Sequence, residues 1–258
     1  MDLQRLLYPA YERQLLAALD LDALPAHVAV ILDGNRRFAK VRGKRPTDGH
    51  RAGAAKIDEF LQWCTQLSIP YVTLWLLSTD NLDREESELA ALLEVIKDTV
   101  VGMASSGNQR DRNIRVQPVG ALELLPEPIR RAMTEAAEAT ADNDGLFVQV
   151  AVGYGGRREI VDAVQALLLE RAGAGRTLDE VARELTDEDI GRHLYTTGMP
   201  DPDLIIRTSG EVRLSGFLLW QSAHSEYYFC DPFWPDFRRM DFLRALRDYQ
   251  RRHRRFGR

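Results

Sequence analysis

Short apolar runs rich in β-branched residues alternate along this chain with longer segments in which apolar residues recur at helical spacing. The runs predict six strands, at 27–32, 71–77, 114–119, 146–152, 204–206 and 227–229. The segments between them predict helices at 53–67, 85–103, 126–141, 157–171 and 241–253, with two short helices within 177–194. This rhythm is typical of an α/β fold. We therefore expect a single domain with a central, mostly parallel six-stranded sheet flanked by helices.

The first 25 residues form a separate region in this pattern, which Pro25 ends. Six large residues fall near one face of an amphipathic helix, namely Leu3, Leu6, Leu7, Tyr11, Leu15 and Leu16. This face is expected to pack on its own domain or on a partner subunit, and a transient contact with a membrane surface is the weaker alternative. The segment is too charged for a signal peptide, and no run approaches the roughly eighteen apolar residues of a membrane span.

Composition narrows the classes of partner. The chain has 39 acidic and 34 basic side chains and a net charge of -5, which argues against nucleic acid as the main partner. Its two cysteines, Cys64 and Cys230, are far apart and match no metal-binding spacing. Isolated thiols of this kind favour a protein of the reducing cytoplasm.

Segment 207–226, RTSGEVRLSGFLLWQSAHSE, is the strongest candidate for binding chemistry. It places Arg207, Arg213 and Ser215 beside the apolar run 217–220, which we predict to be a strand. Guanidinium groups and hydroxyls bind phosphate oxygens, and in an extended chain Arg213 and Ser215 face the same side. The combination indicates a phosphate attached to an apolar group. The alternative is that the two arginines are surface ion-pair partners of Glu211.

A second candidate is the sequence DGNRR at 33–37, directly after a predicted buried strand. Ligands bind beyond the carboxyl ends of strands in open α/β sheets. Here Asp33 could hold Mg²⁺, and the side chains that follow could donate hydrogen bonds to an anion. His50 lies in the following segment, and a structural role and a catalytic role are equally good readings of it.

Two more polar segments follow strands. Ser78, Asn81 and Arg84 recur at a three-residue spacing that places them on one face of a helical turn, and they could equally cap the next helix. The glycine-rich segment 153–158 predicts a tight chain reversal, because it lacks the lysine and the glycine order of a nucleotide-binding loop. The C-terminal sequence RRHRRFGR is either a solvated basic tail or a segment that reaches a phosphate.

At several ordered motifs the chain resembles the cis-prenyltransferases, the Z-type polyprenyl diphosphate synthases that include undecaprenyl diphosphate synthase. The motifs are HVAVILDGNRRFAK, GHRAG, LLSTDNLDR, GYGGRREI, DLIIRTSGEVRLSGFLLWQSAHSE and the terminal RRFG. By this resemblance, residues 26–258 are expected to form a catalytic domain with an apolar product tunnel. The all-helical trans-type enzymes are excluded because the chain has no DDxxD motif.

The resemblance implies Mg²⁺-dependent joining of isopentenyl diphosphate to an allylic diphosphate in a homodimer. Asp33 and Glu226 are expected to hold Mg²⁺, while His50 and Asn81 would assist the chemistry. The expected substrate-binding residues are Gly34, Asn35, Arg36, Arg37, Phe38, Arg45, Ser78, Leu82, Arg84, Arg207, Arg213 and Ser215. Arg255 and Gly257 match the terminal motif that reaches into the neighbouring subunit's site. The 78–88 loop is expected to close over the carbocation and exclude water.

Departures from the family pattern bear on binding and on product length. Arg36 replaces a glycine, Phe38 and Leu82 each replace a tryptophan, and Pro46 takes the register of an arginine that Arg45 would have to replace. Leu76 stands where long-chain members tend to have a small residue, on the strand that lines the product tunnel. Added volume there predicts a short product, (2Z,6E)-farnesyl diphosphate made from geranyl diphosphate. The alternative is that Leu76 packs in the core and leaves the tunnel open.

Three rival functions share the fold. A long-chain decaprenyl or undecaprenyl diphosphate synthase would keep every site residue and differ only in tunnel volume. An irregular isoprenoid-coupling enzyme is disfavoured because the motifs around Asn81 and His50 are intact. A non-catalytic accessory subunit would normally lack Asp33 or the terminal arginine motif, and both are present. In this light the run 217–220 is expected to serve core and dimer packing.

Overall fold

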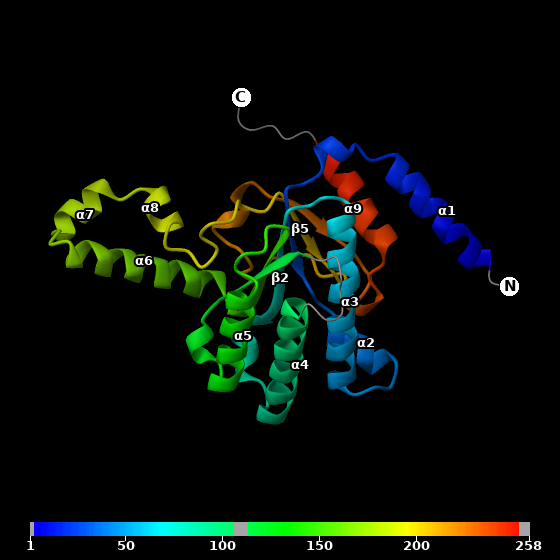
Figure 1. Cartoon of the computed structure of the whole chain (residues 1–258), viewed down its shortest axis with the longest axis horizontal. Helices are drawn as coiled ribbons and strands as arrows, with labels where there is room; N and C mark the ends of the chain where they lie inside the picture. Colours follow the sequence, from blue (N-terminus) through cyan, green and yellow to red (C-terminus); the bar gives the residue numbers. More distant parts are fainter. Residues whose placement is uncertain (1–2, 106–112, 253–258) are drawn as a thin grey trace.

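The computed structural model describes residues 3–105 and 113–252 (Figure 1). Its six strands pair in parallel in the order β3-β4-β2-β1-β5-β6. They are β1 (His27–Ile31), β2 (Tyr71–Ser78), β3 (Ile114–Val119), β4 (Leu146–Tyr154), β5 (Leu204–Arg207) and β6 (Glu226–Phe229). The predicted α/β class and the parallel six-stranded sheet are confirmed.

Helices connect and flank these strands. They are α1 (Leu3–Ala17), α2 (Asn35–Val41), α3 (Pro46–Gln66), α4 (Glu86–Ala104), α5 (Glu127–Ala139), α6 (Gly156–Gly173), α7 (Leu178–Glu184), α8 (Asp187–Gly191) and α9 (Arg239–Arg251). Short 3₁₀ turns are η1 (Leu21–Ala23), η2 (Thr79–Asp83), η3 (Leu122–Leu124), η4 (Gln221–His224) and η5 (Trp234–Asp236). In Figure 1, α6 projects from the sheet towards α7 and α8, while α1 lies on the opposite side, beside α9. Within the described ranges, no helix is both long and apolar enough to cross a membrane.

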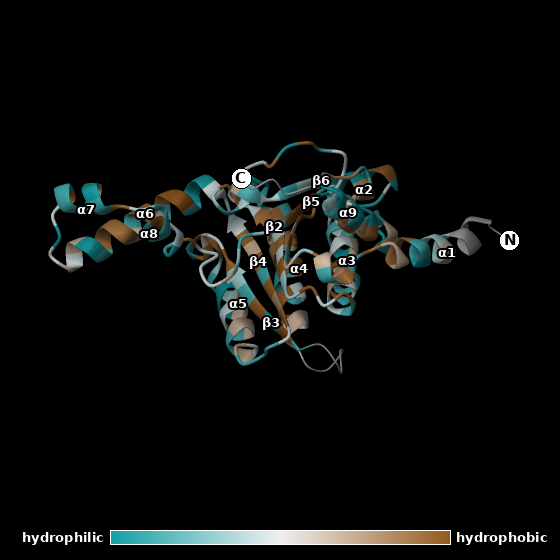
Figure 2. Ribbon diagram, turned by 90° about the horizontal axis from the view of Figure 1, so that it is seen from above, coloured by the Kyte–Doolittle hydropathy of each residue, from teal (hydrophilic) through white to brown (hydrophobic). Residues whose placement is uncertain are grey.

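The two faces of the sheet pack differently, because alternate side chains of a strand point to opposite faces. Val28, Val30 and Leu74 belong to the large core that also contains the buried residues of α3, α4, α5 and α9. Ala29 and Trp75, on the other face, belong to a smaller cluster with segment 217–218. Figure 2 shows hydrophobic residues concentrated on the central strands.

The strand order places a crevice between β1 and β5. From β1 the chain passes through α2 and α3 to β2 on one side, whereas from β5 it passes to β6 on the other side. Ile31 and Arg207, the last residues of these two strands, are register partners. Neighbouring strands whose connections diverge in this way form the ligand-binding switch point of open α/β sheets.

The structure corrects two predictions for the segment that follows β1. Segment 33–37 was predicted as a polar loop, but from Asn35 it belongs to helix α2, which follows Gly34 at a φ of 103°. Helix α3 begins at Pro46 instead of residue 53. Proline is favoured in the first turn of a helix, and the Asp48 carboxylate accepts a hydrogen bond from the Arg45 backbone N–H at 3.1 Å, so local sequence sets this start.

The apolar run 217–220 is a series of turns and not the predicted strand. Ser215 and Leu218 have φ values of 52° and 45°, which an extended chain does not allow. The expected same-side alternation of Arg213 and Ser215 is therefore wrong. The hydrophobic assignment was right in part: Phe217 is 0% exposed and lies in the core of the second sheet face.

Candidate active site

A cavity of about 600 Å³ opens at the carboxyl ends of β1, β2 and β5 and extends between α3 and α4. Its interior is lined mainly by apolar side chains, among them Ala54, Ile57, Leu76, Leu92, Val95 and Ile96. Its mouth is polar and carries Asp33, Arg36, Arg37, Ser78, Asn81, Arg84, Arg207, Arg213 and Ser215. Loops from four distant parts of the sequence thus meet around one amphipathic site.

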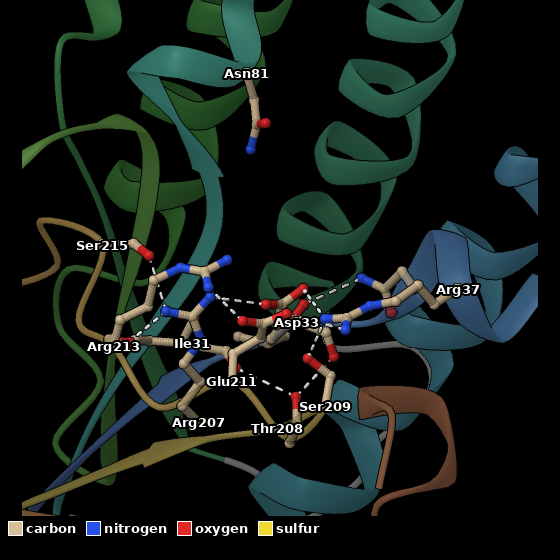
Figure 3. A network of polar contacts seen from close by, with 12 residues as sticks. Ile31, Asp33, Arg37, Asn81, Arg207, Thr208, Ser209, Glu211, Arg213 and Ser215 are labelled. Carbon is tan, nitrogen blue, oxygen red and sulfur yellow. Dashed lines mark hydrogen bonds and ion pairs between the residues drawn. The ribbon is translucent and has the colours of Figure 1, made fainter. Parts of the chain in front are cut away.

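Asp33 and Arg207 form the centre of the mouth (Figure 3). Arg207 is 4% exposed, and its Nη2 donates to Asp33 Oδ2 at 2.9 Å, while Arg37 Nη2 lies 3.5 Å from Oδ1. Burial alone would raise the pKa of Asp33, but the hydrogen bond and charge of Arg207, together with Arg37, lower it. The carboxylate is therefore ionised at neutral pH.

Glycine at position 34 follows from the close approach of two other segments. A Cβ there would lie 2.8 Å from Phe233 Cδ1 and 2.9 Å from Ser209 Cβ, and the φ of 103° disfavours a larger residue. The next residue, Asn35, lines the cavity but donates to the Leu32 carbonyl at 3.3 Å, and its Oδ1 is buried against Gly53. Asn35 therefore joins α2 to α3, and because its amide has a second hydrogen, its predicted role as a donor to a ligand stays a prediction.

One side of the mouth is formed by Arg207 and the segment after β5. Arg207 Nη1 donates to Ser215 Oγ at 2.8 Å and also to the Arg213 carbonyl. Glu211 lies in this cavity and accepts from Arg37 Nη1 at 3.1 Å and from the Arg213 guanidinium (Figure 3). Of the two arginines, Arg213 pairs with Glu211, as the alternative to anion binding predicted, whereas the buried Arg207 pairs with Asp33.

Two residues of this segment escaped the sequence interpretation. The Thr208 hydroxyl donates to the Asp33 carbonyl at 2.7 Å, and Ser209 Oγ accepts from Arg37 Nη2 at 2.6 Å (Figure 3). Both hydroxyls fix the loop after β1 against the loop after β5. Their position directly after Arg207 is the feature of the sequence that could have identified them.

The opposite side of the mouth comes from η2 and α2. The three-residue spacing of Ser78, Asn81 and Arg84 corresponds to one face of the 3₁₀ turn, and Arg84 Nη2 donates to Asn81 Oδ1 at 2.7 Å. Glu88 pairs with both Arg84 at 3.2 Å and Arg36 at 3.5 Å. The alternative capping role belongs to another residue, since the Glu85 side chain caps α4.

His50 lies on α3 and lines the cavity with 9% of its surface exposed. Burial, followed by the charge of Arg84, lowers the pKa of its imidazole to about 4. Its Nε2 is buried and has no hydrogen-bond partner among the described residues. A neutral imidazole with a free ring nitrogen at a cavity wall is able to accept a proton or a hydrogen bond.

Several expected site residues lie elsewhere. Phe38 stacks under the Arg42 guanidinium at 3.9 Å, the exposed Arg45 pairs with Asp48 at 3.3 Å, and Leu82 packs against the main core. None of these three is among the residues that line the cavity. Arg255 and Gly257 lie outside the described residues.

Glu226 is at the wrong end of the sheet for a metal site shared with Asp33 in one chain. It begins β6 and pairs in register with Leu204, which pairs with Val28 of β1, five residues before Asp33. At about 3.3 Å per strand residue, this register separates the two positions by roughly 16 Å. Glu226 instead accepts from Arg252 at 2.9 Å, and the described residues contain no cluster of three or more potential metal ligands from His, Cys, Asp and Glu.

Leu76 is half-buried, and it both lines the cavity and packs against the main core. Core packing and a place on the cavity wall therefore occur together. The effect of Leu76 on product length stays a prediction.

Fold and site together define a class of protein: an α/β protein with an apolar cavity whose arginine-bearing mouth suits an anionic ligand with an apolar tail. Residues 31–257 match the family model described as putative undecaprenyl diphosphate synthase. The chain belongs to this family, and it is a cis-prenyltransferase. The resemblance of its motifs is thereby confirmed.

Individual relatives cover nearly the whole chain. The (2Z,6E)-farnesyl diphosphate synthase of Thermobifida fusca is 59% identical over 252 residues, 97% of each protein. Isoprenyl transferase 1 of Streptomyces avermitilis is 54% identical over 256 residues, 99% of this chain and 98% of the relative. The crystal structure of lavandulyl diphosphate synthase from Lavandula x intermedia, in complex with dimethylallyl diphosphate, superposes with a TM-score of 0.83 at 34% identity and covers 92% of this chain and 100% of that one.

Proposed function

We propose that this cis-prenyltransferase joins geranyl diphosphate to isopentenyl diphosphate and releases (2Z,6E)-farnesyl diphosphate. The observation that carries the proposal is the division of the mouth around Asp33. Arg36 and Arg84, which share Glu88 of α4, lie on the side of the apolar cavity between α3 and α4, and they suit the allylic diphosphate with its tail in the cavity. Arg37 reaches between the two sides, to Ser209 and Glu211. Arg207, Arg213 and Ser215 lie on the other side, and they suit isopentenyl diphosphate.

The reaction follows from this charge distribution. The C1–O bond of the allylic substrate breaks with its electron pair on the departing diphosphate, whose charge the arginines stabilise. The isopentenyl double bond then forms the new bond to C1, and loss of a C2 proton creates the cis double bond. The neutral imidazole of His50 is available at the cavity wall as a proton or hydrogen-bond acceptor.

Asp33 fits a magnesium ion that is shared with a substrate. Mg²⁺ is commonly held by one or two carboxylates together with substrate phosphates, and Asp33 is an ionised carboxylate at the cavity mouth. When bound, the ion would supply charge neutralisation to the leaving diphosphate. Because Glu226 lies at the other end of the sheet, we assign the ion to Asp33 alone within one chain.

A homodimer is part of the proposal, because the carboxyl end of α9 lies at the end of the sheet opposite the site. Arg252 Nη1 donates to Glu226 Oε2 and to the Tyr227 carbonyl, both at 2.9 Å, at the sheet end opposite Asp33. Arg255 and Gly257 of the terminal motif follow Arg252 by three and five residues in the sequence. This placement supports the inference that the motif acts at the site of a second subunit.

A short product agrees with the size of the cavity and with Leu76. A volume of about 600 Å³ is typical of sites that hold a drug-sized ligand, which suits a fifteen-carbon diphosphate better than a chain of ten or more isoprene units. The relative in Thermobifida fusca carries the same product in its name.

The proposal is tested by incubating the pure protein with Mg²⁺, radiolabelled isopentenyl diphosphate and geranyl diphosphate, then separating the dephosphorylated products by chromatography. We expect one fifteen-carbon product. Products of ten or more isoprene units would identify a long-chain synthase, and absence of labelled product with geranyl, dimethylallyl and farnesyl diphosphates would refute the activity in this protein.

A further inference from the structure

A buried carboxylate outside the cavity, that of Glu159 in the first turns of α6, has no part in the chemistry above. Glu159 is 0% exposed. Its neighbour Arg158 pairs with Asp162, at 2.8 Å, and not with Glu159. A carboxylate withdrawn from water is costly unless hydrogen bonds replace its hydration, so the groups that donate to Glu159 show what it holds together.

The donors to Glu159 come from three other segments. The Tyr154 hydroxyl at the end of β4 donates to Oε2, and the Tyr195 backbone N–H donates to Oε1 at 3.0 Å. Gln221 Nε2, at the start of η4, lies 3.1 Å from both oxygens and 2.7 Å from Thr196 Oγ1. Burial raises the pKa of Glu159, while these donors act in the opposite direction. Glu159 therefore fixes Gln221 to the start of α6.

Gln221 directly follows segment 211–220, whose backbone is strained. In this segment Ser215 and Leu218 have φ values of 52° and 45°, and Ser209 just before it has a φ of 78°. Residues other than glycine rarely adopt this left-handed region. Such conformations persist only where the surroundings hold them. The segment carries Arg213 and Ser215, so the geometry of one half of the site depends on what holds it.

Two contacts with α6 hold this segment at its carboxyl-terminal side. The Gly156 N–H donates to the Gly216 carbonyl at 2.8 Å, directly after Ser215, and Glu159 binds Gln221 five residues further on. Between these contacts, Phe217 stacks on Trp75 with ring centres 5.0 Å apart and meets Tyr154 edge-on. Tyr154 thus supports both the segment and the carboxylate.

We propose that Glu159 is a positioning residue for the isopentenyl diphosphate half of the site. By fixing Gln221, it holds segment 211–220 so that Ser215 Oγ and the Arg213 carbonyl meet Arg207. Without this anchor the strained segment relaxes, and Arg213 and Ser215 move away from the bound diphosphate. The assignment rests on the proposed function, because it is stated for the substrate that this half binds.

Steady-state kinetics of Glu159→Gln against each substrate test the proposal. An amide at 159 presents a donor where Tyr154, Tyr195 and Gln221 already donate, so we expect the KM for isopentenyl diphosphate to rise about tenfold. The KM for geranyl diphosphate should change by less than about twofold. The exchange Glu159→Gln/Gln221→Glu restores one carboxylate and one amide to the pair and should recover most of the loss.

Asp162→Asn is the matched control, because Asp162 lies on the same helix and accepts from Arg158 and the Tyr195 hydroxyl without touching segment 211–222. It should leave both KM values unchanged. A folded Glu159→Gln with an unchanged KM for isopentenyl diphosphate, or with equal rises in both KM values, would overturn the proposal. If Glu159→Gln does not fold, the KM values for isopentenyl diphosphate and geranyl diphosphate are measured with the exchange variant and with Tyr154→Phe instead. The proposal then requires that Tyr154→Phe raise the KM for isopentenyl diphosphate alone.

Arg213→Ala separates this proposal from the function on which it rests. If Arg213→Ala leaves the KM for isopentenyl diphosphate unchanged, this half of the site does not bind that substrate. Both the substrate assignment and the proposed role of Glu159 are then overturned. If Arg213→Ala raises this KM and Glu159→Gln does not, only the role of Glu159 is overturned.

Discussion

Leu76 is the residue that we propose to limit the space for an apolar tail. It lines the cavity from β2 and is half-buried. Leu76→Ala removes wall volume, so we expect products longer than fifteen carbons to appear when isopentenyl diphosphate is in excess. Chromatography of the dephosphorylated products, compared with the wild type, measures the change.

Leu74→Ala is the control for this variant. Leu74 lies on the same strand and is 0% exposed, but it is not a residue of the cavity wall. Its truncation should reduce the free energy of unfolding by about 2–5 kcal/mol and leave product length unchanged. A Leu76→Ala enzyme that still stops at fifteen carbons would show that another residue sets the length.

His27 predicts a pH dependence of stability away from the site. It is 2% exposed, its Nδ1 lies 2.7 Å from the Pro200 carbonyl, and burial lowers its pKa to about 4 from 6.5. Because the folded pKa is below the unfolded one, His27 contributes stability above pH 6.5 that is lost as pH falls towards 4. Between pH 7 and pH 5 this loss is about 2 kcal/mol, and His50 adds a similar amount.

Urea unfolding at pH 7 and pH 5 measures this dependence. His27→Gln keeps a neutral polar side chain that does not titrate, so the decrease in unfolding free energy between the two pH values should be about half that of the wild type. A decrease equal to that of the wild type would mean that His27 does not bind a proton on unfolding in this range.

The sequence alone identified ionisable residues of the cavity mouth, but it did not predict their hydrogen-bond and ion-pair partners. Residue type and position after a strand indicated Asp33, Arg207 and Arg84, and all three line the cavity. The pairing of Arg37 with Ser209 and Glu211 could not be predicted, because these residues are more than 170 positions apart and meet only when β1 and β5 pair.

At the scale of elements, the contact between α2 and α3 determines where Arg36 and Arg37 point. A Cβ at Gly49 would lie 2.1 Å from the Asn35 carbonyl oxygen, a backbone atom that cannot move without α2. Gly49→Ala should therefore displace α2 and lower kcat/KM for geranyl diphosphate by about tenfold or more. The measurement is initial rates at saturating isopentenyl diphosphate.

Gly102→Ala is the matched control within a helix. Among the described residues, apart from the neighbours of Gly102 in α4 and the backbone of that helix, no atom lies within 4 Å of a Cβ at this position. Alanine should therefore keep activity and raise the free energy of unfolding by up to about 1 kcal/mol. If Gly49→Ala behaved like Gly102→Ala in both activity and stability, α2 and α3 would not be in the close contact described here.

The elements were predictable where periodicity is strong and were missed where it is short. The six strands have apolar runs, and register in a parallel sheet places them together. Helix α2 has seven residues, of which only Ala39 is buried, so its sequence has no apolar stripe from which a helix could be predicted. The turns at 215–220 place Ser215 and Leu218, as well as Gly216, in the left-handed region, and local sequence preference does not predict that conformation for serine and leucine.

In the whole molecule, the cavity and the carboxyl end of α9 lie at opposite ends of the sheet. The cavity lies at the carboxyl ends of the strands, whereas Arg252, the residue after α9, contacts Glu226 and Tyr227 at the amino end of the sheet. Arg255 follows Arg252 by three residues, which span at most roughly 11 Å when extended, less than the roughly 16 Å that separate Glu226 and Asp33 along the strands. A terminal motif that acts on diphosphates is therefore better placed to serve a neighbouring subunit than its own.

Mixing two inactive variants tests this arrangement. In a mixed dimer of Asp33→Ala and Arg255→Ala subunits, one site has both defects and the other has neither, provided that the motif acts on the neighbouring subunit. Activity should therefore reappear on subunit exchange, at about a quarter of the wild-type rate if exchange is random and one site in a mixed dimer works independently. If Arg255 acted within its own chain, every site would carry one defect and the mixture would stay as inactive as its parts.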